Sequence, residues 1–283
     1  MNYVNINGQL TQNQEAKIHI SDLGLRRGYG AFEFFRVLRG IPVFIEDHLA
    51  RLENSAQLIE LVVPYSQAQL EHFIHELIQV NGLERAGIQM VLTGGYSEDA
   101  FTPSEPNLII APISVKPQPE SHYTQGSKII LYQNLRELAQ AKTTAYVTAV
   151  KLSKRVKAEG ATEVVYHDGN YVTEGGRSSL CIIKNGTLIT AKDGVLPGIT
   201  RMHMLGLAQQ LLRVEYRAFT LEELFSADEV ILTGATREVM PVTRIEDKLV
   251  AGGQVGSYTK TLMKAFREHV EAYLQQKAQE VSS

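Results

Sequence analysis

The sequence of 283 residues contains one cysteine, Cys181, and no long apolar run. A single cysteine excludes an internal disulfide framework and a zinc site built from several cysteines. Wholly apolar stretches such as 108–112 fall far short of the roughly 18 residues that a membrane-spanning helix needs. The first eight residues show neither the basic region nor the apolar core of a secretory signal. These absences predict a soluble, cytoplasmic protein with no metal site and no membrane partner.

An excess of basic charge is also lacking, because 28 Lys and Arg residues stand against 31 Asp and Glu residues. Nucleic-acid-binding proteins usually carry a basic excess, so nucleic acid is not expected as the main partner. Apolar residues make up 44% and charged residues 21% of the chain, which is typical of a globular protein. The length corresponds to one large domain or two domains of ordinary size.

Strand and helix patterns alternate along the whole chain. In the first half, two helices are predicted over 46–61 and after the N-cap residue Ser66, because apolar residues recur there every three or four positions. The hairpin around Arg39-Gly40 contains Pro42, which places its second strand at a sheet edge. In the second half, helices are predicted over 145–159, 200–212 and 256–277. Strands are predicted over 3–7, 31–38, 41–45, 88–92, 108–111, 128–132, 162–166, 171–173, 180–184 and 228–232.

A linker candidate follows the last strand of the first half. The segment 115–121 contains two prolines and few apolar residues. This division predicts an α/β (α+β) chain of two domains, with an N-terminal domain over 1–116, a linker over 117–126 and a C-terminal domain over 127–283.

Two stretches in the second half have the composition of anion-binding backbone. Leu196-Pro197-Gly198-Ile199-Thr200-Arg201 leads into a helix, whose free N–H groups and dipole can bind a phosphate. Thr233-Gly234-Ala235-Thr236 follows a strand and allows backbone amides to approach an anion. The alternatives are an ordinary capped helix and a plain turn.

Three charged residues could carry chemistry, and each has a simpler interpretation. Arg51 adjoins the apolar seam of the first helix and would need an anionic partner, unless it is a solvated surface residue. Lys142 lies among small residues, and a lysine that forms an imine must be unprotonated, which a desolvated setting favours. Glu174 ends a strand before two glycines and could pair with a protonated heterocycle, or with a nearby arginine.

The order of these stretches resembles the class IV pyridoxal-phosphate aminotransferases, also called fold type IV. The resemblance runs from Tyr3 to the last helix. The family includes D-amino-acid transaminases, branched-chain aminotransferases and aminodeoxychorismate lyases. The most specific parts of the resemblance are Leu-Pro-Gly-Ile-Thr-Arg at 196–201 and Glu-Val-Met-Pro-Val at 238–242, the end of the motif that begins with Thr233. Glu174 lies 32 residues after Lys142, as in the D-amino-acid transaminases. The resemblance implies a small N-terminal α/β domain and a larger C-terminal pseudo-barrel domain with helices.

The resemblance also implies residue roles. Lys142 is similar to the lysine that forms the imine with pyridoxal 5′-phosphate and moves the substrate proton. Glu174 is similar to the carboxylate that keeps the pyridine nitrogen protonated, which lets the ring accept electrons. The other implied cofactor contacts are Arg51, Ile199, Thr200, Ala235 and Thr236 at the phosphate, and Tyr146 at the phenolic oxygen.

The chain departs from the family where the substrate carboxylate is held. A typical D-amino-acid transaminase has an Arg and, two residues later, a His after the strand 88–93, whereas Gly94 and Tyr96 stand here. Phe32 replaces the usual Tyr, as in branched-chain enzymes. Those enzymes then have Glu-Gly, but here Glu33-Phe34 follows, which counts against a standard branched-chain enzyme.

Arginines at unexpected positions could replace the missing carboxylate trap. Arg177 lies three residues after Glu174, and Arg26 and Arg27 lie in the loop before Phe32. An arginine binds a carboxylate through two parallel hydrogen bonds. The alternatives are that Arg177 pairs with Glu174 or another acid, and that Arg26 and Arg27 are ordinary loop charges.

The predicted function is therefore that of a homodimeric aminotransferase, which exchanges the amino group of a small amino acid with a 2-oxo acid. The favoured amino donor is a D-amino acid such as D-alanine. The alternatives within the family are a branched-chain L-amino-acid aminotransferase and an aminodeoxychorismate lyase. An alternative of another class is a non-catalytic pyridoxal-phosphate-binding protein, which the presence of both Lys142 and Glu174 disfavours.

Overall fold

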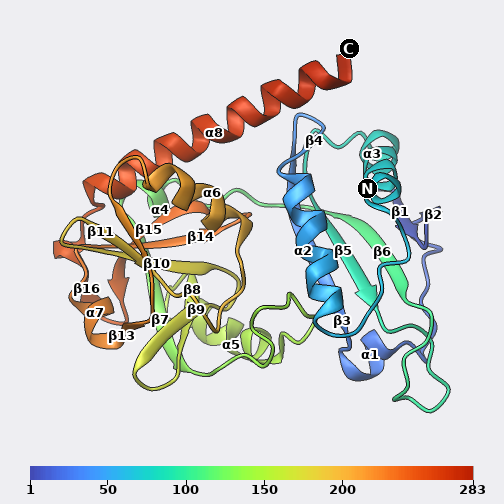
Figure 1. Ribbon diagram of the computed structural model, residues 1–283, viewed down its shortest axis with the longest axis horizontal. Helices are drawn as coiled ribbons and strands as arrows, with labels where there is room; N and C mark the ends of the chain where they lie inside the picture. The colour runs from blue at the N-terminus through green and yellow to red at the C-terminus, as the bar shows by residue number, and fades with distance from the viewer. Residues whose placement is uncertain (283) are drawn as a thin grey trace. The chain divides into compact units, whose positions relative to one another are not determined.

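The computed structural model describes residues 1–282, which form two compact units, each with its own β-sheet (Figure 1). The first unit comprises Met1–Lys116, Ala141–Ala145 and the chain from Ala272 onward. The second comprises Pro117–Gln140 and Tyr146–Glu271. Each unit combines a sheet with helices, so the predicted mixed α/β class is confirmed. The short segment Ala141–Ala145 packs with the first unit although its neighbours in sequence belong to the second.

The first unit contains a six-stranded antiparallel sheet in the order β2-β1-β6-β5-β3-β4. The β4 strand lies at the edge of this sheet, as Pro42 predicts, because proline cannot donate a ladder hydrogen bond. Arg39 and Gly40 both have positive φ in the β3–β4 turn, which matches the twist of a two-residue hairpin. The strands are β1 (Tyr3–Ile6), β2 (Gln9–Gln12), β3 (Gly30–Leu38), β4 (Ile41–Pro42), β5 (Arg85–Thr93) and β6 (Asn107–Ile113).

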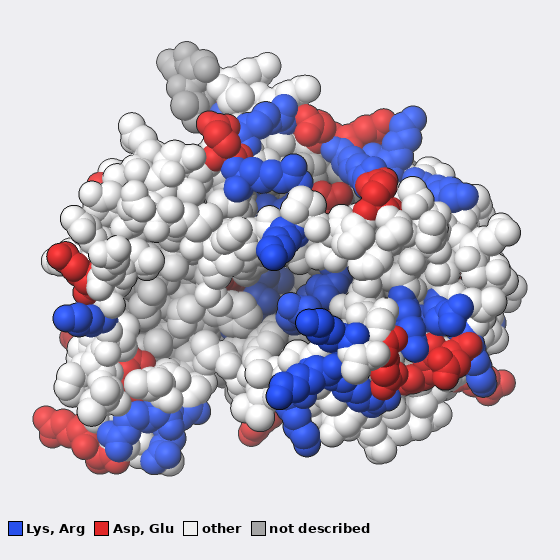
Figure 2. Space-filling model, turned by 180° about the vertical axis from the view of Figure 1, so that it is seen from behind, with Lys and Arg blue, Asp and Glu red and all other residues white. Residues whose placement is uncertain are grey.

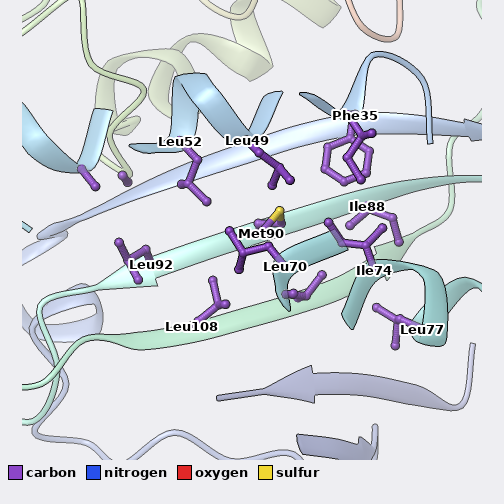
Figure 3. Packing of buried hydrophobic residues seen from close by; sticks show 14 of the residues in the cluster. Phe35, Leu49, Leu52, Leu70, Ile74, Leu77, Ile88, Met90, Leu92 and Leu108 are labelled. Atoms are coloured by element: carbon purple, nitrogen blue, oxygen red, sulfur yellow. The ribbon is translucent and has the colours of Figure 1, made fainter. Parts of the chain in front are cut away.

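Two helices, α2 (Ile45–Gln57) and α3 (Gln67–Asn81), pack on one face of this sheet, and a short helix, α1 (Leu23–Arg27), precedes β3. The predicted N-cap of the second helix is confirmed, since Ser66 and Gln69 form a reciprocal capping box. Figure 3 shows the core between the helices and the strands, where Leu49 and Leu52 of α2 and Ile74 and Leu77 of α3 lie over Phe35, Ile88, Met90 and Leu108.

The second unit contains a ten-stranded mixed sheet in the order β12-β11-β10-β14-β15-β7-β8-β9-β13, and β16 pairs with β15. The β7 strand is parallel to β8 and to β15, and β11 is parallel to β12. The strands are β7 (Ser127–Gln133), β8 (Glu163–His167), β9 (Tyr171–Gly175), β10 (Ser179–Lys184), β11 (Thr187–Thr190), β12 (Arg213–Tyr216), β13 (Phe219–Thr220), β14 (Glu229–Gly234), β15 (Glu238–Ile245) and β16 (Lys248–Leu249).

Both faces of the β7–β8 region are covered, because alternate residues of a strand point to opposite faces. Ile129 belongs to the large core of the unit, whereas Ile130 packs with Leu152 of α5. The helices of this part of the chain are α4 (Ser121–Thr124), α5 (Val147–Ala158), α6 (Ile199–Ala208), α7 (Leu221–Phe225), the 3₁₀ turn η1 (Ala251–Gly253) and α8 (Ser257–Ser282).

The helix boundaries differ modestly from those predicted. The α6 helix ends at Ala208, four residues before its predicted end, because Gln210 and Leu211 close a tight turn onto Leu207 and Ala208. The α8 helix continues to Ser282, five residues beyond the predicted end. Both differences exceed the residue or two by which the assignment of a helix end varies, so the predicted ends at 212 and 277 are wrong.

The described residues include no helix that is both long and apolar enough to cross a membrane. On the face drawn in Figure 2, acidic side chains accompany the Lys and Arg side chains at several places. This mixture agrees with the small net charge of −3.

Candidate functional site

Backbone hydrogen bonds fix the Lys142 segment to the first unit. The Lys142 carbonyl accepts a 2.8 Å hydrogen bond from the Phe32 amide, and the Thr144 amide donates to Gly30 at 2.9 Å. On the other side, the Lys142 amide donates to the Ser55 hydroxyl of α2 at 3.1 Å. Residues 142–144 therefore lie along the first residues of β3, where Thr143 forms a single antiparallel β-bridge with Ala31.

The Lys142 side chain lies over an aromatic ring. Its Nζ atom is 4.4 Å from the centre of the Phe32 ring, and both side chains are half-buried. Phe32 points to the sheet face opposite that of Glu33 and Phe35, because residues alternate along β3. The structure thus brings together Lys142 and Phe32, two of the residues predicted for the site.

Arg51 is held by a buried carboxylate directly behind this position. Its Nε and Nη2 atoms donate to the two Glu33 oxygens at 2.7 and 2.8 Å, and His48 Nδ1 is 2.8 Å from Glu33 Oε2. Although burial alone would raise it, the charge and hydrogen bonds of Arg51 hold the pKa of the fully buried Glu33 well below its usual range. Burial lowers the pKa of His48. The anionic partner that a buried Arg51 requires is therefore supplied within the chain, with the guanidinium plane fixed.

The other arginines predicted in the first unit lie at the end of α1. Arg26 and Arg27 are exposed, and Arg27 Nε donates to the Ala100 carbonyl at 3.0 Å. Among residues 1–282, the Arg26 side chain has no hydrogen-bond or ion-pair partner. The next residue, Gly28, accepts a 2.5 Å hydrogen bond from the Thr144 hydroxyl, so the end of α1 adjoins the Lys142 segment.

Gly94, where the resemblance led us to expect an arginine, has no room for a side chain. A Cβ atom at Gly94 would lie 2.5 Å from Cδ1 of Tyr29 and 3.2 Å from Leu23, so any side chain there meets an occupied space. Tyr96 is 44% exposed and stacks edge-on against His19 at 5.8 Å. Neither position presents a cation.

In the second unit, Glu174 is the penultimate residue of β9, in a buried position with both oxygens engaged. Arg136 Nη1 is 2.6 Å from Oε1, and the Leu196 amide donates to Oε2 at 2.9 Å. Arg136 therefore takes the ion-pair role that the sequence left open to Arg177. These contacts anchor the carboxylate in one orientation, and its remaining lone pairs can still accept a further donor.

Tyr166 lies within electrostatic range of this carboxylate and of Tyr146. Tyr146 is the half-buried N-cap residue of α5. Tyr166 of β8 is 2% exposed, and burial together with Glu163 raises its pKa to about 12. Arg136, Glu174 and Tyr146 all contribute to the electrostatic environment of the Tyr166 hydroxyl, which is protonated at neutral pH.

The two predicted phosphate elements are formed by α6 and by the β14–β15 turn. The α6 helix begins at Ile199 and Thr200 after Gly198, and no side chain of the described residues caps it. A Cβ atom at Gly198 would lie 2.5 Å from the Ser179 hydroxyl, so this approach requires glycine. The turn of Gly234, Ala235 and Thr236 closes with a 3.0 Å hydrogen bond from the Arg237 amide to the Gly234 carbonyl.

Thr233 and Arg177, whose backbones adjoin this turn, each carry a polar side chain with no partner among residues 1–282. The Thr233 hydroxyl is buried and has no hydrogen-bond partner in the described part of the chain. Arg177 is exposed, and its side chain makes no hydrogen bond or ion pair within 1–282. A Cβ atom at Gly234 would lie 3.4 Å from the Arg177 carbonyl, so the backbone of Arg177 adjoins the turn.

The predicted site residues thus form two groups, one in each unit. Arg136 and Tyr166 were not predicted, because Arg136 lies in an irregular loop and Tyr166 reads as an ordinary strand residue. A cavity of about 470 Å³ between α2 and the residues 60–70 contains none of the predicted residues. No group of three or more metal-ligating side chains occurs among the described residues.

Comparison with known sequences gives two results. The profile of the family described as amino-transferase class IV matches residues 30–245. A D-alanine aminotransferase of Listeria monocytogenes serotype 4b is 32% identical over 276 residues, which cover 94% of this chain and 95% of the relative.

Comparison with solved structures gives similar coverage. The branched-chain amino acid aminotransferase of Escherichia coli has a TM-score of 0.88 at 26% identity, over 94% of both chains. The branched-chain aminotransferase of the thermophilic archaeon Thermoproteus uzoniensis, solved with norvaline, has a TM-score of 0.85 at 26% identity, over 95% of this chain and 94% of the other. A further branched-chain amino acid aminotransferase, solved with pyridoxamine 5′-phosphate, has a TM-score of 0.87 at 25% identity. That match covers 95% of this chain and 93% of the other.

Proposed function

We propose that this chain, which belongs to the class IV aminotransferase family, uses pyridoxal 5′-phosphate to exchange an amino group between a small D-amino acid and a 2-oxo acid. The observation that carries the proposal is the buried Glu174 carboxylate, oriented by Arg136 and by the Leu196 amide. The choice of D-amino acids is supported by the D-alanine aminotransferase relatives, at 32% and 30% identity.

The residues present fit this cofactor. The uncapped start of α6 offers the amides of Ile199 and Thr200 to a phosphate, and the dipole favours an anion there. The Thr233 hydroxyl, which has no partner in the described part of the chain, directly precedes the turn whose Ala235 and Thr236 would complete the phosphate contacts. Tyr146 would contact the phenolic oxygen, and Arg51 would add positive charge.

When bound, pyridoxal phosphate supplies an electron-accepting ring and an aldehyde carbon for the amino group. Glu174 would hold a proton on the pyridine nitrogen, because an anchored carboxylate cannot turn away from it. Lys142 would bond to the aldehyde carbon and, once released, move the proton at its Nζ atom. Phe32, 4.4 Å from that atom, shields one side of it from water.

The substrate carboxylate would be held by arginines at positions unusual for the family. Arg177 adjoins the turn of Gly234, and no acid of the described residues neutralises it. The Arg26 side chain likewise has no hydrogen-bond or ion-pair partner among residues 1–282, whereas the Arg27 Nε–H donates to the Ala100 carbonyl. We therefore assign the trap to Arg177 with Arg26 or Arg27, on one copy or between the two copies of a cytoplasmic homodimer.

A second candidate is a branched-chain L-amino-acid aminotransferase, which the match to the Escherichia coli enzyme favours. The ring of Phe34 argues against this candidate. It lies 2.6 Å from the position that a Cβ atom of Gly87 would take. The ring therefore fills space that would be empty if residue 34 were the glycine of branched-chain enzymes. Assays of D-alanine, L-leucine and aminodeoxychorismate on the same preparation separate the transaminases from the lyase. We expect turnover with D-alanine and 2-oxoglutarate, and preferred turnover of L-leucine would contradict the proposal.

A further inference from the structure

Arg237 directly follows the turn assigned above to the phosphate, and its side chain is buried. It is 5% exposed, and its Nη2 atom lies 3.1 Å from Glu163 Oε2 and 3.0 Å from the Thr162 carbonyl. Its Nε–H is buried and has no partner among the described residues. The side chain thus ties the turn to β8, since the Arg237 amide also closes that turn onto Gly234.

Glu163 connects this arginine to the loop that follows Glu174. The Ser178 hydroxyl donates to Glu163 Oε2 at 3.3 Å. A Cβ atom at Gly175 would lie 3.1 Å from Cγ of Glu163, and one at Gly176 would lie 3.4 Å from Oε1. The two glycines therefore allow the Glu163 side chain to pack directly beneath the loop 175–178.

The Glu163–Arg237 pair lies between the two elements that would hold opposite ends of the cofactor. Glu174 begins the loop on one side, and Ala235 and Thr236 form the turn on the other. Removing two charges from water costs folding free energy. A protein with well-packed apolar side chains of similar volume in their place is often as stable as one with the buried ion pair. Stability alone therefore does not account for a buried ion pair at this junction.

We propose that Arg237 and Glu163 are positioning residues, which hold the turn 234–236 at a fixed spacing from the Glu174 loop and so set how tightly the cofactor is retained. This inference rests on the proposed function. It requires neither residue to touch the substrate, and it assigns the effect to cofactor retention rather than to the chemical step.

The test compares the rate at which holoenzyme variants lose bound pyridoxal phosphate on dialysis. Arg237→Met leaves Glu163 buried without its partner and also weakens folding, so the informative variant is Glu163→Leu with Arg237→Met. The double variant removes both charges and is expected to unfold near the wild-type urea concentration. Its cofactor should nevertheless dissociate about tenfold faster than that of the wild type. That factor corresponds to the interaction free energy typical of buried residues in contact.

A matched control is Arg217→Met, which removes the 2.7 Å ion pair to Glu223 in the same unit. This variant should release the cofactor at the wild-type rate. Saturating pyridoxal phosphate should restore most of the kcat of the double variant, which a loss of catalytic groups would not allow.

Release from the double variant at the wild-type rate would overturn the positioning role alone. A wild-type protein that retains no pyridoxal phosphate would overturn the proposed function together with this inference, so the two failures are distinguishable.

Discussion

Replacing Glu33 with glutamine tests the electrostatic arrangement behind the Lys142 segment. Glu33 is fully buried and accepts hydrogen bonds from two Arg51 nitrogens and from His48, at 2.7–2.8 Å. Glutamine preserves the shape but removes the charge, so the buried Arg51 would lose the anion that its Nε and Nη2 atoms contact. Breaking one side of a buried ion pair costs about 3–5 kcal/mol. We expect the free energy of unfolding at pH 7 to fall by that amount.

The same carboxylate predicts a pH dependence of stability. The folded pKa of Glu33 lies below its ordinary value of 4.5, so between those values the unfolded chain binds a proton that the folded chain does not. Its contribution is fully present above about pH 4.5 and is lost as the pH falls toward the folded value. The lowered pKa of His48 acts in the same direction below about pH 6.5.

Urea unfolding of the wild type and of Glu33→Gln at several pH values measures both effects. The difference in unfolding free energy should be largest at neutral pH and should shrink below about pH 4.5. The matched control is Glu33→Leu combined with Arg51→Met, which should recover most of the stability because no charge stays buried. If the unfolding free energies of the wild type and Glu33→Gln differ little at pH 7, or by the same amount at every pH, Glu33 is not the ionised partner of Arg51.

Three further substitutions probe the candidate site. Lys142→Ala should abolish transamination while the unfolding midpoint changes little, because the contact of its Nζ with Phe32 contributes only about 0.5–1 kcal/mol; residual turnover would contradict the assignment. Arg177→Ala should raise the Michaelis constants of amino donor and oxo acid alike by about tenfold to a hundredfold, because each would lose a charge-assisted hydrogen bond to its carboxylate. A loss of cofactor retention with unchanged Michaelis constants would argue against the carboxylate trap. Gly94→Ala should destabilise the protein by about 1–3 kcal/mol in urea unfolding, because its Cβ would meet the Tyr29 ring, and unchanged stability would show that the ring moves freely.

The regular elements of the first unit could be predicted from local patterns. The spacing of Leu70, Ile74 and Leu77 and the cap at Ser66 depend on neighbouring residues, and the α3 helix follows them. The alternation along β3 and the turn at Arg39-Gly40 are similarly local. Short elements such as β12, β13 and α7 were not predicted, because two to five residues contain too little periodicity to distinguish them from loop.

The contacts of the site could not be predicted, because they join residues distant in sequence. Glu33 and Arg51 meet only because a strand and the following helix face each other, and Arg136 reaches Glu174 across 38 positions. The position of Lys142 beside β3 depends on one short segment packing with the first unit rather than with its sequence neighbours. Residue types indicated candidate chemistry, but burial and ion-pair partners required the fold.

The proposed function is tested most directly by a single turnover of the holoenzyme without an oxo acid. We predict that D-alanine releases close to one equivalent of pyruvate per bound cofactor, that L-alanine and L-leucine release little oxo acid, and that the Lys142→Ala variant releases none. Release of oxo acid from L-leucine but not from D-alanine would contradict the assignment to D-amino acids. Absence of product with every amino acid would contradict the proposed transamination itself.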